Sequence, residues 1–318
     1  MAEGLTISAR RNALPEHQPV LLREVVRLLA LQPGDLVVDG TVGLGGHALA
    51  CLERIGSGGF LVGVDRDPES LSWARHRLRG YAAQVALVQE SFVHLPEILR
   101  HWGIKRVDRI LLDLGLSLFQ ITSPRFSYQT PGPLDFRLDP RQELTAAEVV
   151  NTWPEEQLRD ILRRYGEERW ARRIARNIVQ QRQRRPLDTT AELVEVVRGS
   201  LPPSARPRWR SAMSRVCQAL RILVNDEIGA LEQVLRTAPG LLSPGGRLAV
   251  ISFHSLEARC VKRQFAALTK PAGEPNASVP PGSQYRLVTR KAVRPSREEM
   301  VRNRRARSAT LRVLERME

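Results

Sequence analysis

Short apolar runs alternate with amphipathic stretches over the first third of the chain. We expect four strands, at 35–39, 60–65, 85–89 and 107–113. We expect helices around them, at 20–31, 47–55, 68–79 and 94–102. Strands that alternate with helices in this way predict a parallel sheet with right-handed crossovers, which is an α/β fold.

The pattern changes after Leu114. Residues 115–143 are rich in Pro, Gly and aromatic side chains and show no sustained period, so we expect a long loop with a functional role. Capping-box patterns that predict helix starts follow at Thr145, Thr152 and Thr189. Further apolar residues recur every four positions and predict the buried face of a helix, at Trp170, Ile174 and Ile178.

The α/β pattern resumes in the last third of the chain. We expect a long helix over about 212–236, a loop at 271–285, and strands within 243–253, 286–293 and 308–316. The simplest organisation is one α/β domain formed by residues 1–120 and 213–318. A loop and a helical insertion at 121–212 interrupt it, and we expect this insertion to recognise the substrate.

The composition is that of a folded soluble protein, with 42% hydrophobic and 26% charged residues. No apolar run approaches the roughly 18 residues that span a bilayer, and the first 20 residues lack the apolar core of a secretory signal. The three cysteines have no close spacing, which argues against a disulfide framework and a zinc cluster. We therefore expect a cytoplasmic protein without a metal or a membrane partner.

The net charge of +15 is unevenly distributed. Residues 1–120 carry 13 basic and 13 acidic side chains, so the whole excess lies in the remainder of the chain. Of the 49 basic residues, 45 are arginine, which forms bidentate hydrogen bonds with phosphates and stacks on bases. A nucleic-acid partner is favoured, and a merely solubilising surface stays open as the alternative.

Residues 39–50 read DGTVGLGGHALA and join an expected strand to an expected helix. Gly43, Gly45 and Ala48 fit the G-x-G-x-x-G/A fingerprint, and Asp65, 22 residues beyond Gly43, can accept ribose hydroxyls. This turn alone does not separate a nicotinamide dinucleotide from S-adenosylmethionine. Polar residues also end the third and fourth strands, and such a row of strand ends is typical of Rossmann-like methyltransferases.

Several longer segments carry a family resemblance: DGTVGLGGH (39–47), GVDRDP (63–68), GPLDFRLDP (132–140), QALRILVNDE (218–227), SPGGRLAVISFHSLEARCVKR (243–263) and NRRARSATLRV (303–313). In this order they resemble the bacterial 16S ribosomal RNA (cytosine-N4)-methyltransferase family, along nearly the whole chain. The resemblance implies a Rossmann-like class I methyltransferase fold with a mostly parallel sheet and an inserted all-helical domain. It further implies S-adenosylmethionine as methyl donor and the N4 amine of a decoding-centre cytosine, in the small ribosomal subunit, as acceptor. The donor contacts that it implies are Gly45, Gly46, His47, Asp65, Phe92, Asp113 and Gln120.

The N4 amine of cytosine is a poor nucleophile, because its lone pair is conjugated with the ring. It needs an acceptor that orients it and takes its proton. Asp113, at the end of the fourth strand, is our main catalytic candidate, and Asp135 and His254 are further candidates. No cysteine ends that strand, which disfavours methylation at carbon 5. The residue that stacks on the base is sought among Phe119, Phe126, Tyr128 and Phe136.

The family usually reads GVSSPQLD where this chain has GLSLFQITS at 115–123. This departure places Leu118 and Phe119 beside the expected acceptor site and keeps Gln120. RNA contacts are predicted for Arg137, Arg172, Arg176, Asn225 and Ser255. Phosphate contacts are predicted for the basic tail, at Arg302, Arg304, Arg305 and Arg307.

Two other functions use the same glycine turn. An NAD-dependent oxidoreductase would explain the fingerprint but not the arginine-rich remainder. A non-catalytic RNA-binding or ribosome-assembly factor would explain the charge, but not the retention of Gly45, Gly46, Asp65 and Asp113 together. The sequence also allows a homodimer.

Overall fold

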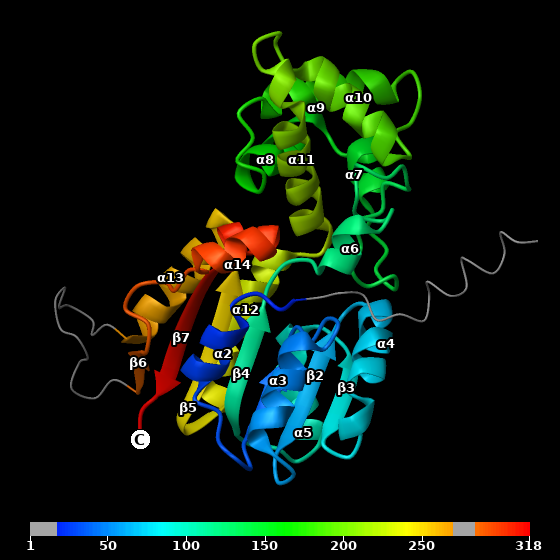
Figure 1. The fold of residues 1–318 in the computed structure, drawn as a ribbon. Helices are drawn as coiled ribbons and strands as arrows, with labels where there is room; N and C mark the ends of the chain where they lie inside the picture. The colour runs from blue at the N-terminus through cyan, green and yellow to red at the C-terminus, as the bar shows by residue number, and fades with distance from the viewer. Residues whose placement is uncertain (1–17, 270–283) are drawn as a thin grey trace, which may run out of the picture. The chain divides into compact units, whose positions relative to one another are not determined.

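The computed structural model describes residues 18–269 and 284–318. The chain divides into two compact units, which we call the sheet unit, Met1–Gly115 with Leu231–Glu318, and the helical unit, Leu116–Ala230 (Figure 1). The helical unit is larger than the predicted insertion at 121–212. The reason lies in the helix that follows residue 208, whose apolar side chains from Ala212 to Val224 belong to the core of the helical unit.

The sheet unit contains one seven-stranded sheet in the order β3-β2-β1-β4-β5-β7-β6. Its strands are β1 (Leu36–Asp39), β2 (Phe60–Asp65), β3 (Val85–Gln89), β4 (Val107–Asp113), β5 (Leu242–Ser252), β6 (Tyr285–Leu287) and β7 (Thr310–Arg316). The first five strands run parallel, and β7 is antiparallel to both β5 and β6. The predicted α/β fold with a mostly parallel sheet is therefore confirmed.

Helices cover both faces of this sheet. The helices outside the helical unit are α2 (Leu22–Leu29), α3 (Gly46–Ile55), α4 (Pro68–Arg77), α5 (Leu95–His101), α12 (Glu227–Leu241), α13 (Ser255–Thr269) and α14 (Arg297–Arg302), with 3₁₀ turns η1 (Arg79–Tyr81), η2 (Phe92–His94) and η4 (Arg304–Ser308). Helices α2 and α3 lie on the face that is turned to the viewer in Figure 1. Alternate residues of β4 point to opposite faces, so that Ile110 and Leu112 pack with α5 and α12, whereas Leu111 packs with α2.

The carboxyl ends of the parallel strands meet at one edge of the sheet. Asp39 pairs in register with Gly63 of β2 and Leu111 of β4, while Asp65 pairs with Gln89. Ligands of open α/β sheets bind in the crevice outside these strand ends. The sheet topology thus gathers Asp39, Asp65 and Asp113 at the edge where a ligand is expected.

The helical unit is built around its own apolar core. Its helices are α6 (Leu118–Thr122), α7 (Ala146–Thr152), α8 (Glu155–Arg164), α9 (Ala171–Arg182), α10 (Thr190–Ser200) and α11 (Trp209–Val224), with the 3₁₀ turn η3 (Arg206–Arg208). The predicted apolar stripe is confirmed at Ile174 and Ile178, which are fully buried. Thr145 and Thr189 cap α7 and α10 as predicted, but Thr152 is the last residue of α7, and Pro154 precedes α8 instead.

Three other predicted boundaries differ from the structure. The long helix expected over 212–236 is two helices, because the chain turns at Asn225 and Asp226, where Asp226 has a φ of +46°. Helix α12 then continues through Pro239. Strand β6 is shorter than the predicted 286–293, and most of the loop expected at 271–285 lies outside the described residues. None of the helices in the described ranges is long and apolar enough to span a bilayer.

Candidate functional site

The glycine turn lies between β1 and α3 and exposes backbone rather than side chains. Gly43 and Gly45 have φ values of +50° and +78°, in the left-handed region that glycine adopts without strain. Gly43 N donates to Asp65 Oδ2 at 2.8 Å, which fixes the turn to the end of β2. Helix α3 begins directly after the turn at Gly46, so its first N–H groups face the same edge of the sheet.

Asp65 ends β2 and accepts two backbone hydrogen bonds. Its second oxygen, Oδ1, accepts from Asp67 N at 2.9 Å. Burial raises the pKa of Asp65 to about 6, although the N–H groups of Asp67 and Gly43 act in the opposite direction. Each carboxyl oxygen keeps a further lone pair, so Asp65 is suited to accept the hydroxyls of a ribose.

Asp113 ends β4 and is tied to the glycine turn through Thr41. Asp113 N donates to Thr41 Oγ1 at 2.6 Å, and Thr41 N donates to Asp39 Oδ1 at 3.2 Å. Burial raises the pKa of Asp39 to about 7 and that of Asp113 to about 7. Asp113 Oδ1 is buried and has no hydrogen-bond partner among the described residues.

His47 lies beside Asp113 on the first turn of α3. The imidazole is 5% exposed, and its Nε2 lies 3.0 Å from the backbone oxygen of Val20. Because a carbonyl only accepts, Nε2 carries the proton in this contact. Burial lowers the pKa of His47, which favours the neutral ring, and its Nδ1 lies 3.5 Å from Asp113 Oδ2.

This arrangement is complementary to a cationic nucleoside. Three carboxyl groups with raised pKa values converge at the strand ends, and one of their oxygens has no partner among the described residues. A positive charge placed there would favour their ionised forms. S-adenosylmethionine supplies a sulfonium, an ammonium and a ribose, so the residues fit this donor.

Phe92 follows β3 at the same edge. Its half-buried ring packs against the core of the sheet unit. The preceding Ser91 is the N-cap of η2, and its hydroxyl accepts from Arg66 Nη2 at 2.9 Å. The strand end therefore presents an aromatic face on a fixed turn, which suits an adenine ring.

The segment after β5 contains the second catalytic candidate, His254. Its Nε2 lies 3.1 Å from Glu257 Oε1, and its Nδ1 lies 3.4 Å from Glu257 N. Glu257 is 2% exposed and accepts from Phe253 N at 2.7 Å. These contacts hold the start of α13, so they favour a structural role for His254. The negative charge of Glu257 also contributes to the raised pKa of Asp113.

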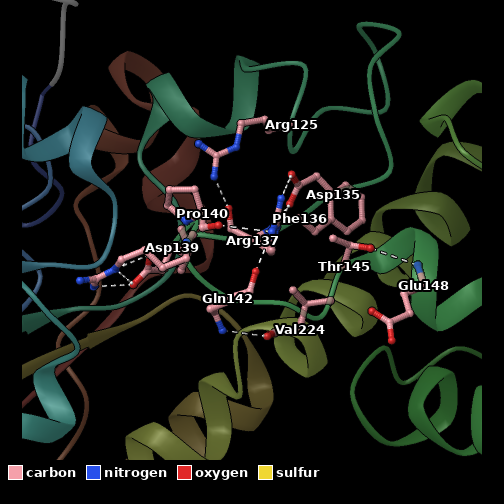
Figure 2. Close-up of polar contacts among 12 residues, drawn as sticks. Arg125, Asp135, Phe136, Arg137, Asp139, Pro140, Gln142, Thr145, Glu148 and Val224 are labelled. Carbon is pink, nitrogen blue, oxygen red and sulfur yellow. Dashed lines mark hydrogen bonds and ion pairs between the residues drawn. The ribbon is translucent and has the colours of Figure 1, made fainter.

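The loop that contains Asp135 and Arg137 lies in the helical unit (Figure 2). Arg137 donates from Nε to Asp135 Oδ1 at 2.8 Å, from Nη2 to Asp135 Oδ2 at 3.0 Å and from Nη1 to the Gln142 oxygen at 2.6 Å. Although partial burial acts to raise the pKa of Asp135, the hydrogen bonds from Arg137 hold it below its usual value. Asp135 is therefore an ion-paired carboxylate, and the Arg137 guanidinium binds this loop, while its contact with RNA stays a prediction.

Asn225 has a structural role in the same unit. It is 1% exposed, its Oδ1 accepts from Leu138 N at 2.8 Å, and its Nδ2 donates to the oxygens of Phe136 and Arg221 at 2.8 and 2.9 Å. Phe136 has a φ of +64°, which is unusual for a bulky residue and has to be held by its surroundings. The predicted RNA contact of Asn225 is therefore corrected to a clamp on residues 136–138.

Comparison with known proteins decides the family. The sequence profile of the MraW methylase family matches residues 15–317. The chain belongs to this family. The resemblance expected from the motifs is thus confirmed, since the match covers nearly the whole chain.

Curated relatives match this chain over nearly their whole length. A protein of Acidothermus cellulolyticus named ribosomal RNA small subunit methyltransferase H is 48% identical over 309 residues, which cover 95% of this chain and 94% of that protein. A protein of the same name from Symbiobacterium thermophilum is 45% identical over 304 residues, covering 94% and 96%. A solved rRNA methylase from Streptococcus thermophilus, at 11% identity, covers 95% of this chain and 98% of its own, with a TM-score of 0.40.

The structure brings most of the predicted donor residues of this MraW methylase to one edge of the sheet. They are Gly45, Gly46, His47, Asp65, Phe92 and Asp113. Gln120 lies in the helical unit, where it forms a reciprocal capping box with Ser117 at the start of α6. Arg172 and Arg176 are exposed on α9, and Ser255 is exposed as the first residue of α13.

Two of the four aromatic candidates for base stacking are wrong. Phe126 and Phe136 are 8% and 1% exposed and belong to the core of the helical unit. Phe119 and Tyr128 are half-buried and stay candidates. The Tyr128 ring meets Trp209 edge to face, with the ring centroids 6.2 Å apart.

One residue that shapes the site, Thr41, was not among the predicted ones. Thr41 connects the turn and Asp39 to β4, and its only sequence signal was its position in the DGT segment. In the basic tail, Arg305 is half-buried and its charge acts to lower the pKa of Asp113. It thereby differs from Arg304 and Arg307, which are exposed, and from Arg302, which pairs with Glu298.

Proposed function

We propose that this MraW methylase transfers the methyl group of S-adenosylmethionine to the N4 amine of a decoding-centre cytosine in the 16S rRNA of the small ribosomal subunit. The main support for this proposal is the position of the Asp113 carboxyl group. This group lies at the end of β4 beside the glycine turn, with one buried oxygen that has no partner among the described residues. An acceptor at this position is what the amine requires.

The donor would be held by the strand ends and the glycine turn. Backbone N–H groups near Gly45 and Gly46 would face its methionine part, Asp65 would accept its ribose hydroxyls, and Phe92 would cover its adenine. When bound, S-adenosylmethionine supplies an activated methyl group on a positively charged sulfur. That charge favours the ionised form of Asp113, which is the form that accepts a proton.

The reaction needs no reactant besides the methyl donor, the cytosine amine and a proton acceptor. The N4–methyl bond forms as the methyl–sulfur bond breaks, and the bonding electron pair stays on sulfur. The amine then loses one proton, which the Asp113 carboxylate takes. In this assignment Asp113 orients and deprotonates the amine, whereas Asp135 is held in an ion pair with Arg137 and His254 lies against Glu257.

The arginine-rich helical unit is proposed to bind the RNA. Arg172 and Arg176 lie one turn apart on α9 and are both exposed, so they are available to phosphates. Phe119 and Tyr128 are the remaining candidates for stacking on the base. A ribosomal substrate also implies that the protein acts in the cytoplasm, and a homodimer stays a prediction.

Neither alternative explains the site as well. An oxidoreductase is disfavoured because the chain belongs to a methylase family. An assembly factor without activity gives no reason for three carboxyl groups with raised pKa values around one turn.

The deciding experiment offers labelled S-adenosylmethionine and purified protein to small ribosomal subunits that lack the modification. The rRNA is then digested, and its nucleosides are analysed by mass spectrometry. Labelled N4-methylcytidine is the expected product, and naked 16S rRNA assayed in parallel shows whether the assembled subunit is required. Donor binding without labelling of subunits, rRNA, tRNA or DNA would favour the assembly-factor function.

A further inference from the structure

The segment around α14 reaches the turn that precedes α2. Glu299 Oε1 accepts a hydrogen bond from Leu21 N at 2.7 Å, and Asn303 Nδ2 donates to the Gln18 oxygen at 3.1 Å. Leu21 is fully buried with a φ of +57°, a conformation that a leucine seldom adopts unless its surroundings hold it. Glu299 therefore holds a strained turn in place from 278 positions away in the chain.

This turn carries the partner of His47. The carbonyl of Val20, one residue before Leu21, accepts from His47 Nε2 at 3.0 Å. The tautomer is thereby fixed, since a proton on Nε2 leaves the lone pair of the neutral ring on Nδ1. That lone pair lies 3.5 Å from Asp113 Oδ2. A continuous path thus runs from Glu299 through the 20–21 turn and His47 to Asp113.

Several charged groups surround the two ends of this path. Asp39 and Glu299 both act to raise the pKa of His47, against the effect of burial. Burial raises the pKa of Asp113, and Glu257 adds to this effect while Arg305 opposes it. Burial outweighs the opposing charges at both ends, so the pKa of His47 is lowered and that of Asp113 is raised.

We propose that Glu299 is a positioning residue for methyl transfer, which holds the 20–21 turn so that His47 Nδ1 faces Asp113 as a hydrogen-bond acceptor. The proton that leaves the amine goes to the Asp113 carboxylate. The neutral imidazole then accepts a hydrogen bond at Nδ1 from the protonated carboxyl group and so orients Asp113. This role rests on the proposed methyl transfer, but the geometry of His47 can be tested without it.

Two conservative variants separate the hydrogen bond from the charge. Glu299→Gln keeps an oxygen at the same reach and removes the charge, whereas Glu299→Asp keeps the charge and withdraws the oxygen by one methylene. We expect Glu299→Gln to retain most of the wild-type kcat, and Glu299→Asp to lose about tenfold, the effect of one hydrogen bond. The matched control is Glu298→Asp, since Glu298 lies next to Glu299 on α14, is exposed and pairs with Arg302.

The second readout is the imidazole itself. In ¹⁵N-labelled protein without RNA, the ring nitrogens of His47, assigned with the variant His47→Gln, should report a single tautomer protonated at Nε2. We expect the Glu299→Gln spectrum to match that of wild type. The Glu299→Asp spectrum should show nitrogen shifts averaged between the two tautomers.

The third readout is coupling between the two sites. If Glu299 acts through His47, Glu299→Asp should have little further effect on kcat in a His47→Gln background, because the target is already gone. An equal loss in both backgrounds, or an unchanged His47 tautomer in folded Glu299→Asp, would overturn the role of Glu299. Absence of methyl transfer by the wild-type protein would count against the proposed function alone, since the nitrogen spectra still test the geometry.

Discussion

Thr41 Oγ1 accepts a hydrogen bond of 2.6 Å from Asp113 N, and this contact ties the glycine turn after β1 to the end of β4. The two residues are 72 positions apart in sequence. The group proposed to accept the proton is therefore placed by the same turn that is proposed to hold the donor. Donor binding and catalytic geometry should consequently change together when Thr41 changes.

Thr41→Val tests this coupling. It removes the acceptor and leaves Asp113 N without its partner, so we expect affinity for S-adenosylmethionine and kcat each to fall by about tenfold. Isothermal titration calorimetry and the methyl-transfer assay measure the two effects. Thr41→Ser keeps the hydroxyl and should remain close to wild type. If the valine variant lost rate but bound the donor normally, the turn and Asp113 would be independent.

Asp113→Asn tests the proton acceptor. The amide is nearly isosteric with the carboxyl group but cannot take the proton, so methyl transfer should fall by a factor on the order of 10² to 10⁴. RNA affinity, measured by filter binding, should stay unchanged because the fold is preserved. A variant that kept the wild-type rate at saturating donor would show that another group accepts the proton.

The raised pKa values predict how the stability of the ligand-free protein depends on pH. Unfolded aspartate ionises near pH 3.9, whereas Asp65 has a pKa of about 6 and Asp39 and Asp113 have pKa values of about 7 when folded. The folded protein therefore holds protons that the unfolded chain has released. The stability that these bound protons contribute is fully present below the pKa of unfolded aspartate. It is lost as the pH rises through the folded pKa values of about 6 to 7.

Urea denaturation between pH 5 and pH 8 measures this dependence. The free energy of unfolding should decrease across the range, and Asp39→Asn should flatten the decrease because it removes one titrating group. S-adenosylmethionine should raise the melting temperature more at pH 8 than at pH 5, because the ionised carboxyl groups attract its positive charges. A stability that rose from pH 5 to pH 8 would contradict the assigned burial of these acids.

Asn225→Ala tests the clamp on residues 136–138. The alanine leaves Leu138 N and the Phe136 oxygen without their bonds, in a position that is 1% exposed. We expect the free energy of unfolding to fall by about 2 to 3 kcal/mol. Gln180→Ala, at an exposed position of α9, is the control and should change it by less than about 0.5 kcal/mol. If the two variants lowered the free energy of unfolding equally, Asn225 would not stabilise the fold through residues 136–138.

The exposed arginines of α9 predict a salt-dependent contact with RNA. The double change Arg172→Gln and Arg176→Gln should weaken binding of 16S rRNA and reduce the slope of log affinity against log salt by about 1.5 to 2. Arg75→Gln with Arg79→Gln alters the net charge equally on the sheet unit, where both residues are exposed. If the two double variants changed the slope of log affinity against log salt equally, the effect would come from the net charge and not from α9.

The sequence by itself determined the local elements and the order in which they occur. The strands that end at Asp39, Asp65 and Asp113 were readable because a buried parallel strand is a short, continuous apolar run. The capping box at Thr189 and Glu192 was readable because both partners lie within one turn of helix. The motifs were also sufficient to indicate the family.

Only the tertiary structure decided which residues meet. Asn225 ends α11 because it binds backbone groups 87 and 89 positions away, which no helical period reveals. Phe126 and Phe136 resembled base-stacking residues until the core of the helical unit buried them. No sequence pattern singled out Glu299, and only the fold placed it at Leu21. Such contacts depend on packing between segments that are distant in the chain, and local patterns carry no record of them.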